Sequence, residues 1–224
     1  MLPRVWHGAI AVLVVVGLII QISIALRVHA TPPSVAPGQL AGATLGGRLL
    51  RVASFFTIQS NILAAITSAQ LARSPGRDGR GWRIARLDAL IGITVTGIVY
   101  STVLARMHEP RGWEQVSSNA IFHYVVPVMM VLGWLAFGPR PRITRATLLA
   151  SLAFPILWFG YTLIHGATDG WYPYPFVDVD THGYPRVLLN ALLVTLVLGA
   201  VSALFWGGDR MLGRAPRAAR PDRG

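Results

Sequence analysis

Six long apolar segments limit what this chain of 224 residues can fold into. They cover about residues 6–27, 49–72, 84–106, 116–137, 144–166 and 186–206, and each approaches the length of a membrane-spanning helix. In hydrocarbon, backbone N–H and C=O groups must pair within the segment, which an α-helix achieves. The sequence therefore predicts an all-α polytopic membrane protein, a bundle of six transmembrane helices.

The segments between the apolar runs are short, and they predict a single domain over residues 1–207. The stretch 28–47 is rich in Pro, Gly, Ala and Thr, which favours an irregular connection. Residues 208–224 contain mainly Arg, Pro, Ala and Gly, and we expect a disordered tail there. Residues 6–27 also resemble a signal peptide, but their apolar stretch is longer than the usual signal core.

Arginine placement predicts the orientation, because all 20 basic residues are arginines and they are unevenly distributed. The N-terminus, the segments near 73–86 and 140–145, and the tail hold 14 arginines, whereas the opposite loops hold 6. Positive charge collects on the cytoplasmic side. We therefore expect a multi-pass protein of the cell (plasma) membrane with both termini in the cytoplasm.

Composition also bears on partners and cofactors. There is no cysteine, which excludes a disulfide framework, a thiol nucleophile and a Cys-ligated metal site. The net charge of +11 lies in loops beside apolar runs, where it is suited to lipid headgroups rather than to nucleic acid. The histidine spacing matches no compact metal site. We expect membrane lipids as partners, with no nucleic acid, metal or other cofactor.

The second apolar run carries an unusual polar stretch, "FFTIQSNIL" (residues 55–63). If the run is one helix, Ser54, Thr57 and Asn61 share a stripe at offsets of three and four, while Gln59 points elsewhere. A polar stripe in a membrane helix faces another helix or a cavity. Alternatively, the hydroxyls bond to carbonyls of their own helix.

The fourth run places Asn119 and His123 on one face, together with Pro127. His123 and Thr57 both fall seven to eight residues below the external ends of their predicted spans, or about 11–12 Å deep. Equal depth allows the two side chains to meet. An ionisable residue at that depth suggests a functional site, although a packed neutral histidine is the alternative.

The fifth run ends in "LIHGATDGWYPYPFVDV" (residues 163–179), with His165 near the same external end. The helix either continues to Asp169 or ends at Gly166. Trp171, Tyr172 and Tyr174 are suited to the headgroup interface. We count His165 with Ser54, Asn61 and Asn119 as candidate binding or orienting residues.

Thr57 and His123 are compatible with a nucleophile and its base if their side chains meet. A threonine hydroxyl becomes a nucleophile when a neighbouring base takes its proton, and His123 is the only ionisable residue predicted at the depth of Thr57. Desolvation favours the neutral imidazole that a base requires. Two other readings stay open: a non-catalytic protein that binds a lipid or small ligand, and a small transporter.

"FFTIQSNIL", "HYVVPVMMVLGWLAF" and "LIHGATDGWYPYPFVDV", in this order, resemble the bacterial Pr6Pr membrane proteins. That family is in turn distantly similar to the androgen-induced membrane threonine hydrolases of animals. The resemblance implies an intramembrane hydrolase of lipid (fatty acyl) esters, with Thr57 as nucleophile and His123 as the catalytic histidine. It implies a lipid ester as substrate.

Overall fold

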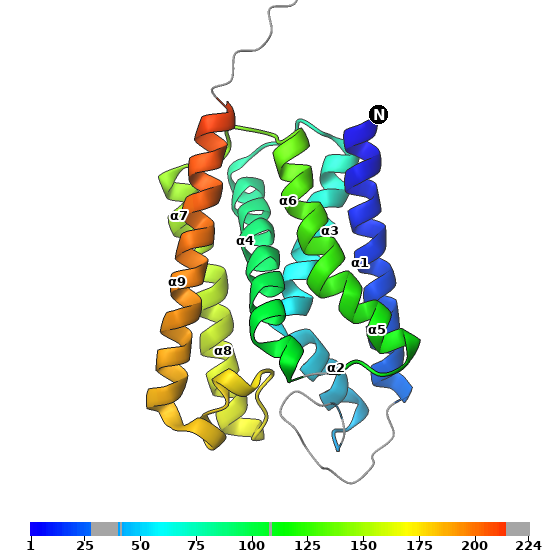
Figure 1. Cartoon of the computed structure of the whole chain (residues 1–224), viewed down its shortest axis with the longest axis vertical. Coiled ribbons are helices and arrows are strands. Elements are labelled where there is room, and N and C mark those ends of the chain that lie inside the picture. Colours follow the sequence, from blue (N-terminus) through cyan, green and yellow to red (C-terminus); the bar gives the residue numbers. More distant parts are fainter. Residues whose placement is uncertain (28–39, 41, 108, 214–224) are drawn as a thin grey trace, which may run out of the picture.

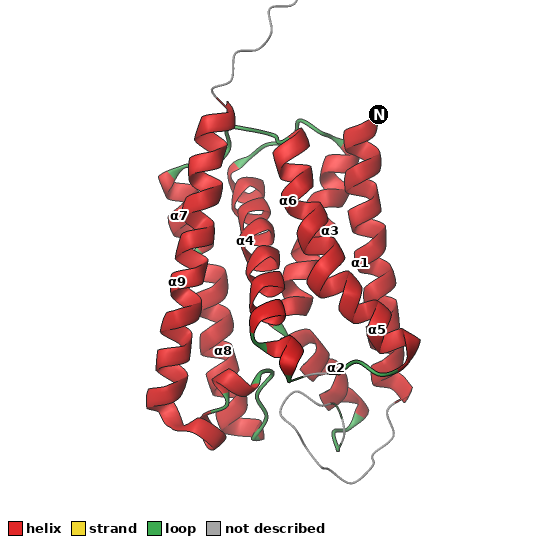
Figure 2. Ribbon diagram, in the orientation of Figure 1, coloured by secondary structure: helices red, strands yellow, loops and turns green. Residues whose placement is uncertain are grey.

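The computed structural model describes residues 1–27, 40, 42–107 and 109–213, and it is a bundle of helices (Figure 1). Among these residues there are helices, turns and loops but no strand (Figure 2). The main helices are α1 (Leu2–Arg27), α2 (Leu45–Ser54), α3 (Phe56–Arg73), α4 (Arg80–Thr102), α5 (Gly112–Ala120), α6 (Val126–Phe137), α7 (Arg145–Ser151), α8 (Ala153–Asp169) and α9 (Val179–Gly213). The predicted all-α fold is confirmed.

The helices have the lengths and apolarity of membrane spans. Five stretches are long and apolar enough to cross a bilayer: α1, α4, α5 to α6, α7 to α8, and α9. The sixth consists of α2 and α3, which together pass the same test but meet at an angle of 69°. Leu157 of α8 and Leu204 of α9 are 70% and 75% exposed, as expected for side chains that face lipid. The protein is an integral membrane protein.

The core lies around α4, which packs against α3, α6, α7 and α9 (Figure 1). Leu90 and Ile93 of α4 pack in one cluster with Ile10 of α1 and Met130 of α6. α3 lies between α1 and α4, so a polar side chain on either of these faces is enclosed by neighbouring helices. This position keeps most polar residues of α3 away from lipid.

The second span is broken, in contrast to the continuous helix predicted over residues 49–72. Phe55 adopts extended backbone (φ −66°, ψ 127°) between α2 and α3. Its ring packs edge-on against Trp171 and Tyr174, at centroid distances of 5.7 and 5.5 Å. Because the chain bends here, Ser54 and Thr57 lie on different helices and do not form one stripe. Thr57 instead occupies the first turn of α3.

The fourth span contains a π-helical segment, η2 (Ile121–Val125), between α5 and α6. Pro127 follows directly in the first turn of α6 and has no N–H to donate to the preceding turn. π-helical turns insert an extra residue into a helix and are common at functional sites. His123 lies at the centre of this segment.

The structure also defines where α8 and α9 end and where the two ends of the described chain lie. α8 continues through Gly166 to Asp169, where Gly170 caps it with a positive φ of 61°. α9 extends past Gly207, where the tail was predicted to begin, and ends at Gly213; residues 214–224 lie outside the described part. The predicted irregular loop over 28–47 also lies outside it, except for residues 40 and 42–47. The N-terminus and the end of α9 lie at the same end of the bundle (Figure 1).

Candidate active site

Thr57 lies at the start of α3, where the first backbone N–H groups of a helix lack partners within the helix. Its side chain is 7% exposed and contacts residues from two distant segments. The hydroxyl Oγ1 is 3.5 Å from Nε2 of His123 and 3.1 Å from the hydroxyl of Tyr174. The backbone N–H of Thr57 also donates to the Tyr174 hydroxyl, at 3.1 Å. A single hydroxyl thus lies between an imidazole and a phenol.

His123 is held by contacts on both sides of its ring. Nδ1 is 3.2 Å from the backbone carbonyl oxygen of Asn119, and the ring stacks on Tyr100 with centroids 3.9 Å apart. A carbonyl accepts only, so Nδ1 carries the hydrogen in this contact. Nε2 then presents its lone pair to Thr57. This is the tautomer that a general base needs.

Tyr174 takes part in the site, although the sequence indicated a place at the headgroup interface. It is only 8% exposed, and Trp171 and Tyr172 are buried as well, so the three rings pack against protein rather than among headgroups. The segment after α8 folds back over the start of α3 (Figure 1). Burial raises the pKa of Tyr174 to about 12, so its hydroxyl keeps its proton at neutral pH.

Asn61 supports the site from the next turn of α3. It is fully buried, and Nδ2 donates to the backbone oxygen of Thr57 at 2.9 Å and of Phe122 at 3.4 Å. The side chain therefore links α3 to the π-helical segment that holds His123. Asn119 orients the imidazole through its backbone oxygen, while its side chain forms a hydrogen bond with Tyr100. Of the four predicted binding or orienting residues, Asn61 and Asn119 contact the site.

Ser54 and His165 belong to a second cluster around Tyr161 and Trp171. Ser54 Oγ donates to Leu50 O at 2.7 Å and is 2.6 Å from the Tyr161 hydroxyl. His165 stacks on Tyr161 and meets Trp171 edge-on. These contacts hold α2 and the end of α8 together. We infer that Ser54 and His165 support the cover, the segment over residues 170–178 that lies on Thr57. They do not take part in chemistry at Thr57.

In the described residues, no group of three or more His, Cys, Asp or Glu side chains could hold a metal ion. The fold and the site define a class: an all-α polytopic membrane protein in which a threonine, buried at a helix N-terminus, lies beside a histidine of a neighbouring helix. No protein-family model matches the chain, and no curated protein or solved structure was found to be similar to it.

Proposed function

We propose that this protein is an intramembrane hydrolase of lipid acyl esters, similar in mechanism to the family that the sequence resembles. One observation carries the proposal: Thr57 Oγ1, His123 Nε2 and the Asn119 carbonyl form a chain of polar contacts at the start of α3. A nucleophile, a base and a group that orients the base are the parts that acyl transfer requires.

In the first step, His123 Nε2 takes the hydroxyl proton of Thr57 while Oγ1 attacks the ester carbonyl carbon. The carbonyl oxygen becomes an oxyanion, which the N–H of Thr57 is suited to stabilise once the Tyr174 hydroxyl that accepts from it has moved away. The carbon–oxygen bond to the alcohol then breaks, and the imidazolium returns the proton to the leaving alkoxide. An acyl ester on Thr57 and a free alcohol result.

In the second step, water attacks the acyl group on Thr57 and His123 again takes a proton. The oxyanion then collapses, the bond between the acyl carbon and Thr57 Oγ1 breaks, and the imidazolium returns its proton to Oγ1, which releases the fatty acid and restores the threonine hydroxyl. Because Thr57 is buried under Tyr174, the substrate must displace the segment over residues 170–178 to reach it. We also propose the plasma membrane as the location, with both termini cytoplasmic and the site in the external half.

The test is hydrolysis of fatty acyl esters by the purified protein in detergent. We expect Thr57→Ser to retain activity and Thr57→Ala to abolish it. His123→Ala should lower the rate by about 10²–10⁴-fold, the usual contribution of a general base. Activity that persists in Thr57→Ala would overturn the proposal. A folded wild-type protein that cleaves no ester would instead favour a non-catalytic lipid-binding or transport role.

A further inference from the structure

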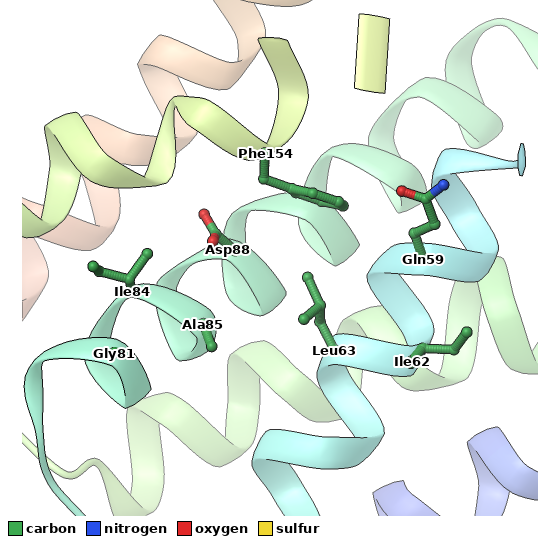
Figure 3. A pocket seen from close by; sticks show the side chains of 8 residues that line it. All are labelled: Gln59, Ile62, Leu63, Gly81, Ile84, Ala85, Asp88 and Phe154. Carbon is green, nitrogen blue, oxygen red and sulfur yellow. The ribbon is translucent and has the colours of Figure 1, made fainter. Parts of the chain in front are cut away.

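A second feature of the molecule lies on the side of α3 away from His123. It is an open groove of about 460 Å³ between α3, α4 and the start of α8 (Figure 3). Leu63, Ile84 and Ala85 supply apolar walls, Gly81 lies at one end, and Phe154 closes the side formed by α8. None of these residues contributes to the Thr57 site, so the groove needs an explanation of its own.

Asp88 is the exception to the apolar lining. It lies within the membrane span α4, and its Oδ1 is buried without a hydrogen-bond partner among the described residues. An ionisable side chain inside a membrane span is costly unless it is paired, and it usually marks a site. Lipid acyl chains in the groove would leave this carboxyl unpaired.

The nearest arginines on α4 do not neutralise Asp88. Arg83 donates to both carboxyl oxygens of Asp78, at 2.5 and 2.7 Å. Arg86 points to another part of the bundle, where it contacts Thr67 and Met130 at 3.4 and 3.3 Å. In the described chain no ion pair reaches Asp88, so a positive charge must come from a ligand if the carboxylate is to be paired.

Two other groups in the groove suit a cation. Gln59 uses its amide nitrogen to donate to Ala53 O at 3.0 Å, and its side-chain oxygen is turned toward the groove (Figure 3). Phe154 extends its aromatic ring between Asp88 and Gln59 (Figure 3), and Phe56 stacks on this ring with centroids 5.1 Å apart. Aromatic faces attract cations. The free polar groups in the groove are therefore acceptors, and its aromatic wall favours positive charge.

We propose that this groove is a binding site for hydrophobic amines, with the protonated nitrogen on Asp88 beside Phe154 and the apolar body along Leu63 and Ala85. The amine supplies the hydrogen-bond donors and the charge that the groove lacks. The apolar body of the ligand contacts the walls of the groove, in the place that lipid acyl chains would otherwise occupy. The site is separate from the proposed hydrolase centre, and Thr57→Ala should leave it intact.

The probe is dansylcadaverine, a fluorescent primary amine with an apolar aromatic body, and its uncharged N-acetyl derivative is the matched control. Titration of the purified protein in detergent should give saturable binding of the amine. N-acetylation should weaken binding at least tenfold, or about 1.4 kcal/mol. Equal binding of both probes would show simple hydrophobic partitioning and overturn the proposal, as would a lack of saturable amine binding.

Two variants test separately whether amine binding requires the Asp88 carboxyl and the open end of the groove. Asp88→Asn should reduce amine binding at least tenfold, whereas Asp180→Asn, an exposed acid at the start of α9, should not change it. Gly81→Leu should also reduce binding, because a Cβ at Gly81 meets no atom within 4 Å and the side chain can fill the end of the groove. Unchanged binding in a folded Asp88→Asn or Gly81→Leu protein would contradict the proposal.

Discussion

The side-chain contacts of the Thr57 hydroxyl come from residues far away in the chain. Tyr174 covers it from the segment after α8, and His123 reaches it from the π-helical segment. Asn61, on the next turn of α3, donates to the backbone oxygens of Thr57 and Phe122 and so links α3 to the π-helical segment. A hydrogen-bond direction consistent with all contacts has Tyr174 donating to Thr57 Oγ1 and Thr57 donating to His123. This direction prepares Thr57 to lose its proton to the imidazole.

At the residue scale, Tyr174→Phe tests the cover. The substitution removes the acceptor for the Thr57 N–H, and a buried unpaired donor costs about 1–3 kcal/mol. We expect a lower unfolding temperature at pH 7, measured by tryptophan fluorescence in detergent. Tyr184→Phe, at an exposed tyrosine, should behave as the wild type.

The same variant has a defined pH dependence. Burial raises the pKa of Tyr174 from 10 to about 12 in the folded state, so the neutral phenol stabilises the fold. That contribution is complete below pH 10, where unfolded tyrosine is also neutral, and it is lost as the pH rises to 12. Tyr174→Phe should therefore lose less stability than the wild type between pH 10 and 12. An equal loss in both proteins would contradict this role.

At the scale of elements, two breaks in helical geometry build the site. The bend at Phe55 begins a new helix, so Thr57 lies in the first turn of α3, and the π-helical segment places His123 against it. The sequence predicted that Thr57 and His123 meet, but on the basis of equal depth in two continuous helices. The bend was not predicted, and the contacts found at it are tertiary: the ring of Phe55 packs on Trp171 and Tyr174. No local pattern reports such contacts.

The cover over the site depends on close packing against α8. A Cβ at Gly166 would lie 2.0 Å from the Tyr172 ring, whereas a Cβ at Gly160 on the same helix meets no atom within 4 Å. We expect Gly166→Ala to destabilise the protein by about 1–3 kcal/mol, the usual cost of overpacking. Gly160→Ala should be neutral or slightly stabilising because alanine favours helix. Similar unfolding temperatures for the two variants would show that the Gly166 contact is unimportant.

At the scale of the whole molecule, the helical bundle of six spans could be predicted from the sequence. Each of the six apolar runs is helical, because length and apolarity alone determine that a segment can span a membrane. The groove beside Asp88 was not predicted, since it combines side chains from α3, α4 and α8 whose spacing in sequence carries no signal. Local composition predicts the spans, while the sites between them depend on how the helices pack.

The orientation also belongs to this scale, and the absence of cysteine makes it directly measurable. Gly76→Cys introduces one thiol between α3 and α4, at a position where a Cβ has open space. Glu109→Cys introduces one at an exposed position between α4 and α5. The arginine distribution predicts that an impermeant maleimide labels the Glu109→Cys protein in intact cells and the Gly76→Cys protein only after lysis. The reverse pattern would place both termini outside.

The central claim is that Thr57 is an activated nucleophile. The most direct measurement is reaction of the detergent-purified protein with a fluorophosphonate probe, followed by peptide mass spectrometry to locate the adduct. We predict a single adduct on Thr57, lost in Thr57→Ala and strongly reduced in His123→Ala while both variants stay folded. A wild-type protein that remains unlabelled, or an adduct at another residue that persists in Thr57→Ala, would contradict the claim.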